Sequence, residues 1–458
     1  MSPPRPSNSA TVGPGRDNAG VTTSDLCRYR GSPLDALNRS SSADVTSVTS
    51  CASHVRSLPG SAGSRTAWPH WVPAAVGDAF GSIGIAQPWT HQALAADLVH
   101  RGTDVVLATG TASGKSLGYQ LPALSAIVAD PRTSVLYLAP TKALAADQLD
   151  DLHSLAVPGL RPTTYDGDTP EEERDWARGH ANWLLTNPDM LHLGLLPHHS
   201  GLARFWRRLA FVVIDECHAY RGVFGSHVAL VLRRLLRVAR LYKADPVCVL
   251  ASATSAAPAA AAARLIGRPV RAITQDGSAR PATDFVLWEP SAGGDDGRPA
   301  GDGSTAPTPL TRPHGAGIGG GGSIDDVDDR TAARRPSAHA EAARLLADLV
   351  AGGARTLTFV RSRQAAEQVA LAARRRLHRI APALAPRVAA YRGGYLPEDR
   401  RELERALNSG ELLGLASTNA LELGIDIAGL DAAVIAGYPG TLAALWQQAG
   451  RAGRGGAV

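Results

Sequence analysis

The stretch ATGTASGKS, residues 108–116, differs by one residue from a well-defined loop pattern. The pattern G-x-x-x-x-G-K-[ST] forms a phosphate-binding loop where it joins a strand to a helix. An apolar run, DVVLAT at 104–109, precedes the stretch, and residues 115–129 have a helical pattern. The closing Gly-Lys-Ser fits, but Thr109 stands where the first glycine is expected. Taken alone, the stretch is equally consistent with a phosphate loop and with a chance turn.

The composition limits the classes of protein to which the chain can belong. With 458 residues and 44% hydrophobic content, it is long enough for two or three globular domains. Its net charge of +5 suits a nucleic-acid partner but does not require one. The 4 cysteines include no C-x-x-C pair, which argues against a disulfide framework or a zinc site. Because the sequence has neither a signal-peptide core nor a run of about 18 apolar residues, it predicts a soluble cytoplasmic protein.

Apolar runs that fit strands alternate with helical stretches in both halves of the chain. In the first half these runs are 104–109, 134–140, 183–188, 211–215 and 247–254. In the second half they are 355–360, 388–394, 413–419 and 431–439. Near-continuous apolar strands separated by helices predict parallel sheets that are covered on both faces and bind ligands at the carboxyl ends of their strands. The predicted fold class is therefore α/β, with two parallel-sheet domains in tandem.

Two segments of different composition set the expected domain boundaries. Residues 1–67 are rich in Ser, Pro and Gly and predict a disordered lead-in. The first domain then covers residues 68–290. Residues 291–337 contain GIGGGGS and DDVDD, a composition that cannot form a core and predicts a flexible linker. The second domain covers residues 338–458.

An acidic pair in the first domain supports the phosphate loop. The strand FVVI runs directly into Asp215 and Glu216, about 100 residues after the loop. At this strand end an acidic residue lies beside a phosphate loop and can hold Mg²⁺, while its neighbour orients or deprotonates a water. Because both motifs occur in one α/β domain, a merely solvated strand end is the weaker interpretation.

Nine motifs in one order now resemble those of the superfamily 2 helicases, which have two RecA-like domains. The sequence DECH places the chain with the DExH type. TGTASGKS, YDGDTP and DECHAYRGVFGSHVALVLRRL look most like the bacterial mitomycin-repair-factor group, relatives of RecQ-like helicases. Such helicases tolerate a residue other than glycine at the first loop position, which accounts for Thr109. The resemblance covers residues 68–458.

The resemblance implies an ATP hydrolase that uses ATP and Mg²⁺, with Gln92 contacting adenine. The implied catalytic residues are Lys115, Asp215, Glu216, Arg451 and Arg454. The implied ATP-binding residues are Gln92, Thr109, Gly110, Thr111, Ala112, Ser113, Gly114, Lys115, Ser116, Gly424 and Asp426. Ser116 and Asp215 would hold Mg²⁺. Arg451 and Arg454 are three residues apart on an expected helix, so they would share one face and reach ATP when the domains close.

The resemblance also implies a DNA helicase or translocase that moves 3′-to-5′ along single-stranded DNA, or duplex with a single-stranded tail, in DNA repair. Residues that would couple hydrolysis to domain movement are His218, Ser252, Ala253, Thr254 and Gln447. Small polar or basic residues at strand ends suit contacts to phosphate and sugar. These are Pro140, Thr141, Lys142, Thr186, Asn187, Arg361, Ser362, Ser417, Thr418 and Asn419.

Two alternatives stay open. The chain stops at Val458, directly after the last motif, so its second domain is expected to be truncated. A chain of this kind would bind nucleotide and nucleic acid without productive turnover if Arg451 and Arg454 were poorly anchored. An RNA helicase is the other alternative, because composition does not distinguish DNA from RNA. The sequence gives no indication of the oligomeric state.

Overall fold

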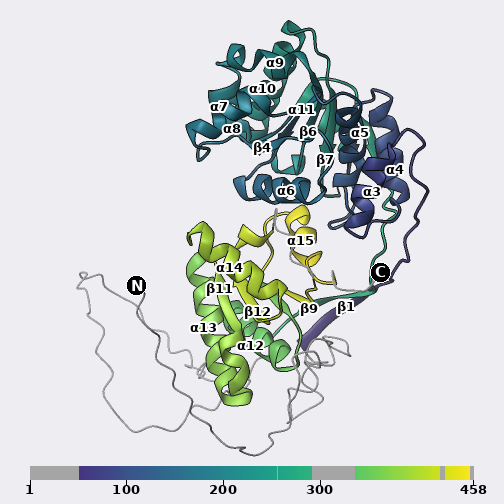
Figure 1. Cartoon of the computed structure of the whole chain (residues 1–458). Coiled ribbons are helices and arrows are strands. Elements are labelled where there is room, and N and C mark those ends of the chain that lie inside the picture. The colour runs from purple at the N-terminus through teal and green to yellow at the C-terminus, as the bar shows by residue number, and fades with distance from the viewer. Residues whose placement is uncertain (1–50, 255, 291–335, 393, 423–428, 454–458) are drawn as a thin grey trace, which may run out of the picture.

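The structure, a computed structural model, describes residues 51–254, 256–290, 336–392, 394–422 and 429–453. These residues form two α/β domains, one above the other in Figure 1, and a two-stranded sheet that runs beside the second. The predicted fold class, two RecA-like parallel-sheet domains in tandem, is confirmed.

The first domain contains a seven-stranded parallel sheet of order β4-β5-β3-β6-β7-β2-β8. Its strands are β2 (Val105–Leu107), β3 (Ser134–Leu138), β4 (Pro162–Thr164), β5 (Trp183–Thr186), β6 (Leu209–Ile214), β7 (Val247–Ala251) and β8 (Arg271–Ile273). One face is covered by α3 (Ala74–Ser82), α4 (Thr90–His100), α5 (Ser116–Ala129) and α6 (Lys142–Ser154). The other is covered by α7 (Glu171–His180), α8 (Pro188–Met190), α9 (Ala203–Arg207), α10 (Gly222–Leu241) and α11 (Pro258–Ile266).

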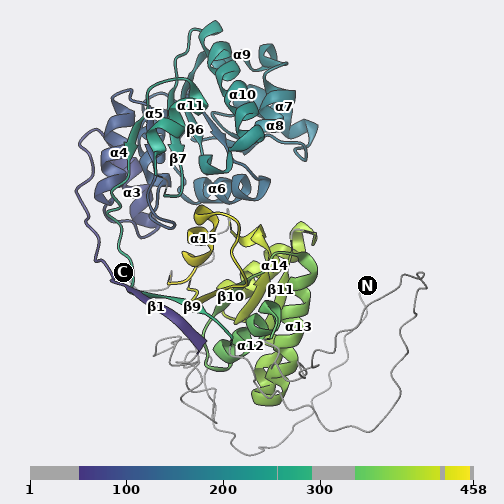
Figure 2. The ribbon, with the colours of Figure 1, turned by 180° about the vertical axis from the view of Figure 1, so that it is seen from behind.

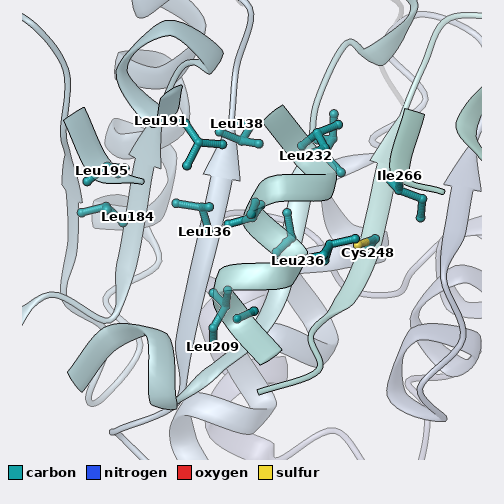
Figure 3. Close-up of a cluster of buried hydrophobic side chains, with 14 of the residues drawn as sticks. Leu136, Leu138, Leu184, Leu191, Leu195, Leu209, Leu232, Leu236, Cys248 and Ile266 are labelled. Carbon is teal, nitrogen blue, oxygen red and sulfur yellow. The ribbon is translucent and has the colours of Figure 1, made fainter. Parts of the chain in front are cut away.

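The central strand β3 shows why this sheet needs helices on both sides. Successive side chains of a strand point to opposite faces. Val135 and Tyr137 therefore pack under α5 and α6, while Leu136 and Leu138 pack in the cluster under α10 that Figure 3 shows. All four residues are at most 1% exposed, which explains why the run SVLYL is apolar throughout instead of alternating.

The second domain has a four-stranded parallel sheet of order β11-β12-β10-β13. Its strands are β10 (Thr356–Phe359), β11 (Val388–Tyr391), β12 (Gly414–Ser417) and β13 (Ala432–Ile435). Its helices are α12 (Ala338–Ala351), α13 (Arg363–Ile380), α14 (Pro397–Asn408) and α15 (Leu442–Ala449). Helices α12 and α13 cover one face, and α14 packs on the other. All nine strands predicted from apolar runs are present, whereas the three-residue strands β4 and β8 were not predicted.

One part of the predicted lead-in is ordered, so that prediction is wrong for residues 52–58. They form β1 (Ala52–Leu58), which pairs antiparallel with β9 (Thr283–Trp288), from Ala52 opposite Trp288 to Leu58 opposite Thr283. Figure 2 shows this β1–β9 sheet from behind. Most side chains of β1 are exposed, so no alternating pattern marks the strand, and its conformation comes from pairing with a distant segment. Residues 1–50 and most of the predicted linker lie outside the described residues.

None of the helices in the described ranges has the length and apolar character needed to cross a membrane.

The core beneath α10 generates a stability prediction. Leu136→Ala removes a fully buried side chain and is expected to lower the free energy of unfolding by about 3 kcal/mol, measured by urea denaturation. Leu193→Ala serves as the control, because Leu193 is 69% exposed and its loss is expected to cost less than about 0.5 kcal/mol. Equal losses in the two variants would contradict the assigned packing.

Candidate ATP site at the domain interface

The phosphate loop, residues 109–116, leads from the carboxyl end of β2 into α5. Ala112 and Gly114 have positive φ angles of 58° and 69°. Turns that alternate between right- and left-handed residues present successive N–H groups as an anion-binding concavity. The Lys115 ammonium donates to the Gly110 carbonyl at 2.9 Å, so its charge lies over the loop. This local geometry fits phosphate binding.

The residue that breaks the loop pattern has a structural role. The Thr109 hydroxyl lies 2.7 Å from the Ser113 hydroxyl, and both residues are 1% exposed. A glycine at this position would leave the Ser113 hydroxyl without that partner. Thr109 therefore stabilises the loop from inside.

Two residues at the start of α4, His91 and Gln92, contact backbone carbonyls of the loop. The Gln92 amide donates to the carbonyls of Ser113 and Gly114 at 3.2 and 2.8 Å and accepts the Trp89 N–H at 2.8 Å. The His91 ring Nε2 lies 3.1 Å from the same Ser113 carbonyl. Both N–H bonds of Gln92 are thus used by the loop. A contact of this amide with adenine stays a prediction, and it would replace one of these bonds.

The predicted acidic pair lies at the carboxyl end of β6. The Asp215 carboxylate accepts the Tyr137 hydroxyl at 2.5 Å and the Glu216 N–H at 2.8 Å. Burial raises the pKa of Asp215, and so does the charge of Glu216, while the bond from Tyr137 and the charge of Lys115 act in the opposite direction. Tyr137 was missed from the sequence, because a tyrosine inside an apolar strand looks like an ordinary core residue.

The donors at this position suit Mg²⁺, which prefers oxygen ligands. Asp215 offers a carboxylate at a strand end, and Ser116 offers a hydroxyl at the first residue of α5. A cation would offset the burial that raises the pKa of Asp215. Nowhere in the described ranges do three or more His, Cys, Asp or Glu side chains gather as ligands. A Mg²⁺ ion held here would therefore take most of its ligands from nucleotide and water.

His218 connects the acidic pair to the second domain. Its Nδ1 atom lies 3.2 Å from a Glu216 carboxylate oxygen and accepts the Ala253 N–H at 3.2 Å. Its Nε2 atom lies 2.7 Å from the Gln447 amide nitrogen on α15. The Ser252 hydroxyl donates to the Ala253 carbonyl at 2.8 Å. The His218 imidazole thus contacts two of the other predicted coupling residues, Ala253 and Gln447, and Ser252 bonds to Ala253.

The two domains also meet at the phosphate loop itself. Gly450 directly follows α15, and a Cβ atom at this position would overlap the Thr111 hydroxyl of the loop. Figure 1 shows α15 between the two domains. A cavity of about 900 Å³ also lies between the domains, lined by His218 and Thr254 on one side and by Thr441 on the other. The fifth coupling residue, Thr254, therefore also faces the interface.

The expected helix through both arginines is not observed. Helix α15 ends at Ala449, and Arg451 lies in the turn that follows, because Gly450 caps the helix and Gly453 has a φ of 79°. Arg451 is 5% exposed, and its guanidinium donates to the Glu422 carbonyl at 2.6 Å within the second domain. Three other predicted site residues lie outside the described residues: Gly424, Asp426 and Arg454.

Four of the predicted nucleic-acid residues share one local role, because each accepts a backbone N–H at the start of a helix. These residues are Thr141 at α6, Asn187 at α8, Ser362 at α13 and Thr418 at the short turn Asn419–Leu421. Helix starts carry positive partial charge, which attracts phosphate. The remaining candidates with accessible side chains are Pro140, Lys142, Arg361 and Asn419.

Two candidates cannot use their side chains on a bound strand. Thr186 is 1% exposed and donates to the Tyr165 carbonyl at 2.6 Å, and Ser417 is fully buried. A contact from either residue would come from its backbone. The accessible Lys142 ammonium is paired with Asp168 at 2.6 Å, a pair that phosphate would compete with.

Comparison with known proteins agrees with this geometry. The sequence pattern of DEAD/DEAH box helicases matches residues 89–262, and that of the helicase conserved C-terminal domain matches residues 341–456. The chain belongs to the DEAD/DEAH-box helicases of superfamily 2. It is 38% identical over 394 residues to YprA of Bacillus subtilis, an uncharacterized ATP-dependent helicase, covering 84% of this chain and 47% of YprA. It is 37% identical over 375 residues to the ATP-dependent helicase HRQ1 of Saccharomyces cerevisiae, covering 80% of this chain and 32% of HRQ1.

Solved helicase structures have the same architecture. The DUF1998 helicase MrfA bound to DNA and AMPPNP is 35% identical and superposes with a TM-score of 0.77, covering 93% of this chain and 54% of MrfA. Lhr of Mycobacterium smegmatis, at 22% identity and a TM-score of 0.61, shares the fold. The chain thus spans half or less of the length of these curated relatives, and about half of MrfA.

The contact between Gly450 and the loop generates a prediction for this chain. Gly450 has an ordinary φ of −69°, but an added Cβ atom would approach both the Thr111 hydroxyl and the Trp446 carbonyl, so Gly450→Ala should shift the last turn of α15 slightly and push α15 away from Thr111. We expect ATP turnover to fall at least about tenfold with little change in melting temperature. Gly77→Ala is the control, since a Cβ atom there meets nothing within 4 Å. Unchanged turnover in Gly450→Ala would show that closure does not bring α15 onto the loop.

The His218 contacts generate a pH prediction. Burial lowers the pKa of His218 below its usual 6.5, although the bond with Gln447 acts in the opposite direction. The folded chain therefore binds this proton less readily than the unfolded chain, and the free energy of unfolding decreases as pH falls below about 6.5. Thermal denaturation at about pH 7.5 and about pH 5.5 should show a larger loss for the wild type than for His218→Gln. Equal losses would mean that another group carries the effect.

Proposed function

We propose that this chain is the motor of an ATP-dependent DNA helicase or translocase, in which ATP hydrolysis moves the two domains along single-stranded DNA. The observation that carries the proposal is the set of contacts around His218. One imidazole lies between Glu216 of the acidic pair and Gln447 of the second domain. A movement of the acidic pair would therefore shift His218 and, through it, helix α15 of the second domain.

The residues of the site have separate roles in the proposed reaction. The N–H groups of the phosphate loop and the Lys115 ammonium bind the phosphates of ATP. Glu216 orients the attacking water and accepts its proton at the carboxylate. Mg²⁺, when bound at Asp215 and Ser116, neutralises charge on the phosphates. Arg451 and Arg454 add positive charge from the second domain once the domains close, for which Arg451 would exchange its bond with Glu422.

The nucleic-acid partner is proposed from the exposed helix starts and from the named relatives. The starts of α6 and α13 lie in different domains, so a strand that touches Thr141 and Ser362 would be pulled when the domains move. Contacts of this kind to phosphate and sugar carry little base information. MrfA has been solved with DNA, which favours DNA over RNA for this chain. Movement 3′-to-5′ and a role in DNA repair complete the proposal.

The first test is ATP hydrolysis by the purified 458-residue chain, without nucleic acid and with single-stranded DNA or RNA. We expect stimulation by DNA, and we expect Lys115→Ala to lower turnover at least about 100-fold, because it removes the charge that stabilises the transferred phosphoryl group. Stimulation by RNA alone would instead favour an RNA helicase. Binding of ATP and DNA without stimulation would favour a fragment that binds both ligands without productive turnover.

The direction of movement is tested on duplexes with one single-stranded tail. A 3′-to-5′ motor separates a duplex with a 3′ tail and leaves one with a 5′ tail intact. Lys115→Ala controls for passive melting. Separation of the 5′-tailed duplex alone would contradict the proposed direction.

A further inference from the structure

Asp276 is a buried carboxylate at the phosphate loop, outside every motif that the sequence suggested. Its side chain is 6% exposed. One oxygen accepts the Gly110 N–H of the loop at 3.1 Å, and the other accepts the Ser278 N–H at 2.9 Å and the Ser278 hydroxyl at 2.6 Å. Although burial raises the pKa of Asp276, the bonds from Ser278 and the charge of Arg280 lower it overall, so the group is ionised. The carboxylate is therefore held in one orientation, with one oxygen on the loop and the other on Ser278.

Gly277, which follows Asp276, packs closely against the start of α4. The Gly277 N–H donates to His91 Nδ1 at 3.2 Å, and the Gly277 carbonyl accepts the Ser64 N–H at 2.7 Å. A Cβ atom at Gly277 would overlap the Thr90 hydroxyl. This segment cannot shift without disturbing His91, which contacts the loop at the Ser113 carbonyl. Asp276 and His91 thus hold the loop from the same side.

The same segment continues as β9 to the second domain. The Phe285 ring lies 5.7 Å from the Trp446 ring of α15. The Trp288 indole N–H donates to the Glu341 carboxylate of α12 at 2.7 Å, and the Arg344 guanidinium lies 5.7 Å from the indole ring. The segment from Asp276 to the end of β9 therefore runs from the loop to two helices of the other domain, and Figure 2 shows β9, paired with β1, beside that domain.

We propose that Asp276 is a positioning residue for ATP binding, and that β9 transmits the position of the phosphate loop to the second domain. This link is separate from the one through His218, which starts at the acidic pair. The two links connect different parts of the ATP site to the second domain. The proposal rests on the proposed ATP-driven motor and assigns a role to a segment that no motif covers.

The loop end of the link is tested with Asp276→Ala. The variant leaves the half-buried Gly110 N–H without this partner, so we expect the Kd of a fluorescent ATP analogue, and KM for ATP, to rise about tenfold with a smaller change in kcat. Asp276→Asn keeps one oxygen acceptor, and with that oxygen on the Gly110 N–H its NH2 group faces Ser278, so Kd should recover in part, to a value between those of wild type and Asp276→Ala. Wild-type Kd in Asp276→Ala, or an equal loss in both variants, would overturn the role of the carboxylate oxygen.

A matched control separates positioning from general stability. Asp104 also accepts a distant backbone N–H, that of Cys248 at 2.7 Å, but at the opposite end of β2 from the loop. Asp104→Ala and Asp276→Ala should both lower the melting temperature, whereas only Asp276→Ala should weaken ATP binding. The same weakening in both variants would mean that loss of stability, and not loop position, explains the result.

The far end of the link is tested with Trp288→Phe, which keeps a ring but removes the bond to Glu341. The measured quantity is the ratio of nucleotide Kd without and with single-stranded DNA. We expect this ratio to fall at least about threefold, with Kd in the absence of DNA unchanged. Trp71→Phe is the control, because it removes a 2.7 Å indole bond to Asp97 within the first domain. An unchanged ratio in Trp288→Phe would overturn the link through β9.

These tests are distinguishable from a failure of the proposed function. If the wild-type chain neither hydrolyses ATP nor responds to DNA, the motor proposal fails. The comparison of nucleotide Kd between wild type and Asp276→Ala still decides the role of Asp276 in that case.

Discussion

The phosphate loop depends on hydrogen bonds from outside itself. A segment rich in glycine and small residues has little stiffness, and ordering it at the moment of binding would cost affinity. Here Gln92 fixes two of its carbonyls, and Asp276 fixes an N–H. The N–H groups that would face phosphate are thereby oriented in advance. The contact of Gly450, in the second domain, with Thr111 of the loop is useful only because the loop has one defined position.

Much of the fold and the ATP site could be predicted because the signals are local. A strand buried on both faces must be apolar throughout, as β3 is, so the sheets are visible as apolar runs. Parallel strands end on one edge, so residues that follow them, such as Lys115 and Asp215, come together without any knowledge of packing. The helix predicted at residues 115–129 is observed as α5, which begins one residue later, at Ser116. The coupling roles of His218 and Gln447 were implied by the helicase resemblance, whereas the contact between these two residues was not predicted.

The features that were missed depend on contacts between distant residues. Asp276 meets Gly110 across 166 positions, and nothing near Asp276 in the sequence marks it as part of a loop. The exposed strand β1 has no apolar pattern, because its order comes from backbone pairing with β9. The spacing of Arg451 and Arg454 predicted that both lie on a helix, but α15 ends at Ala449, before the glycine at 450. The bonds from Gln92 to the loop carbonyls were also not predicted, because a side-chain amide can donate to any nearby carbonyl.

The pairing of β1 with β9 has a consequence for synthesis of the protein. Ser53 of β1 and Leu287 of β9 are 234 positions apart. At the usual rate of translation, β1 leaves the ribosome roughly 10 to 50 seconds before its partner strand is made. The strands can therefore join only after the entire first sheet has emerged. Because Trp288 also contacts α12, the second domain meets a completed first domain, and the order of assembly follows from the order of the chain.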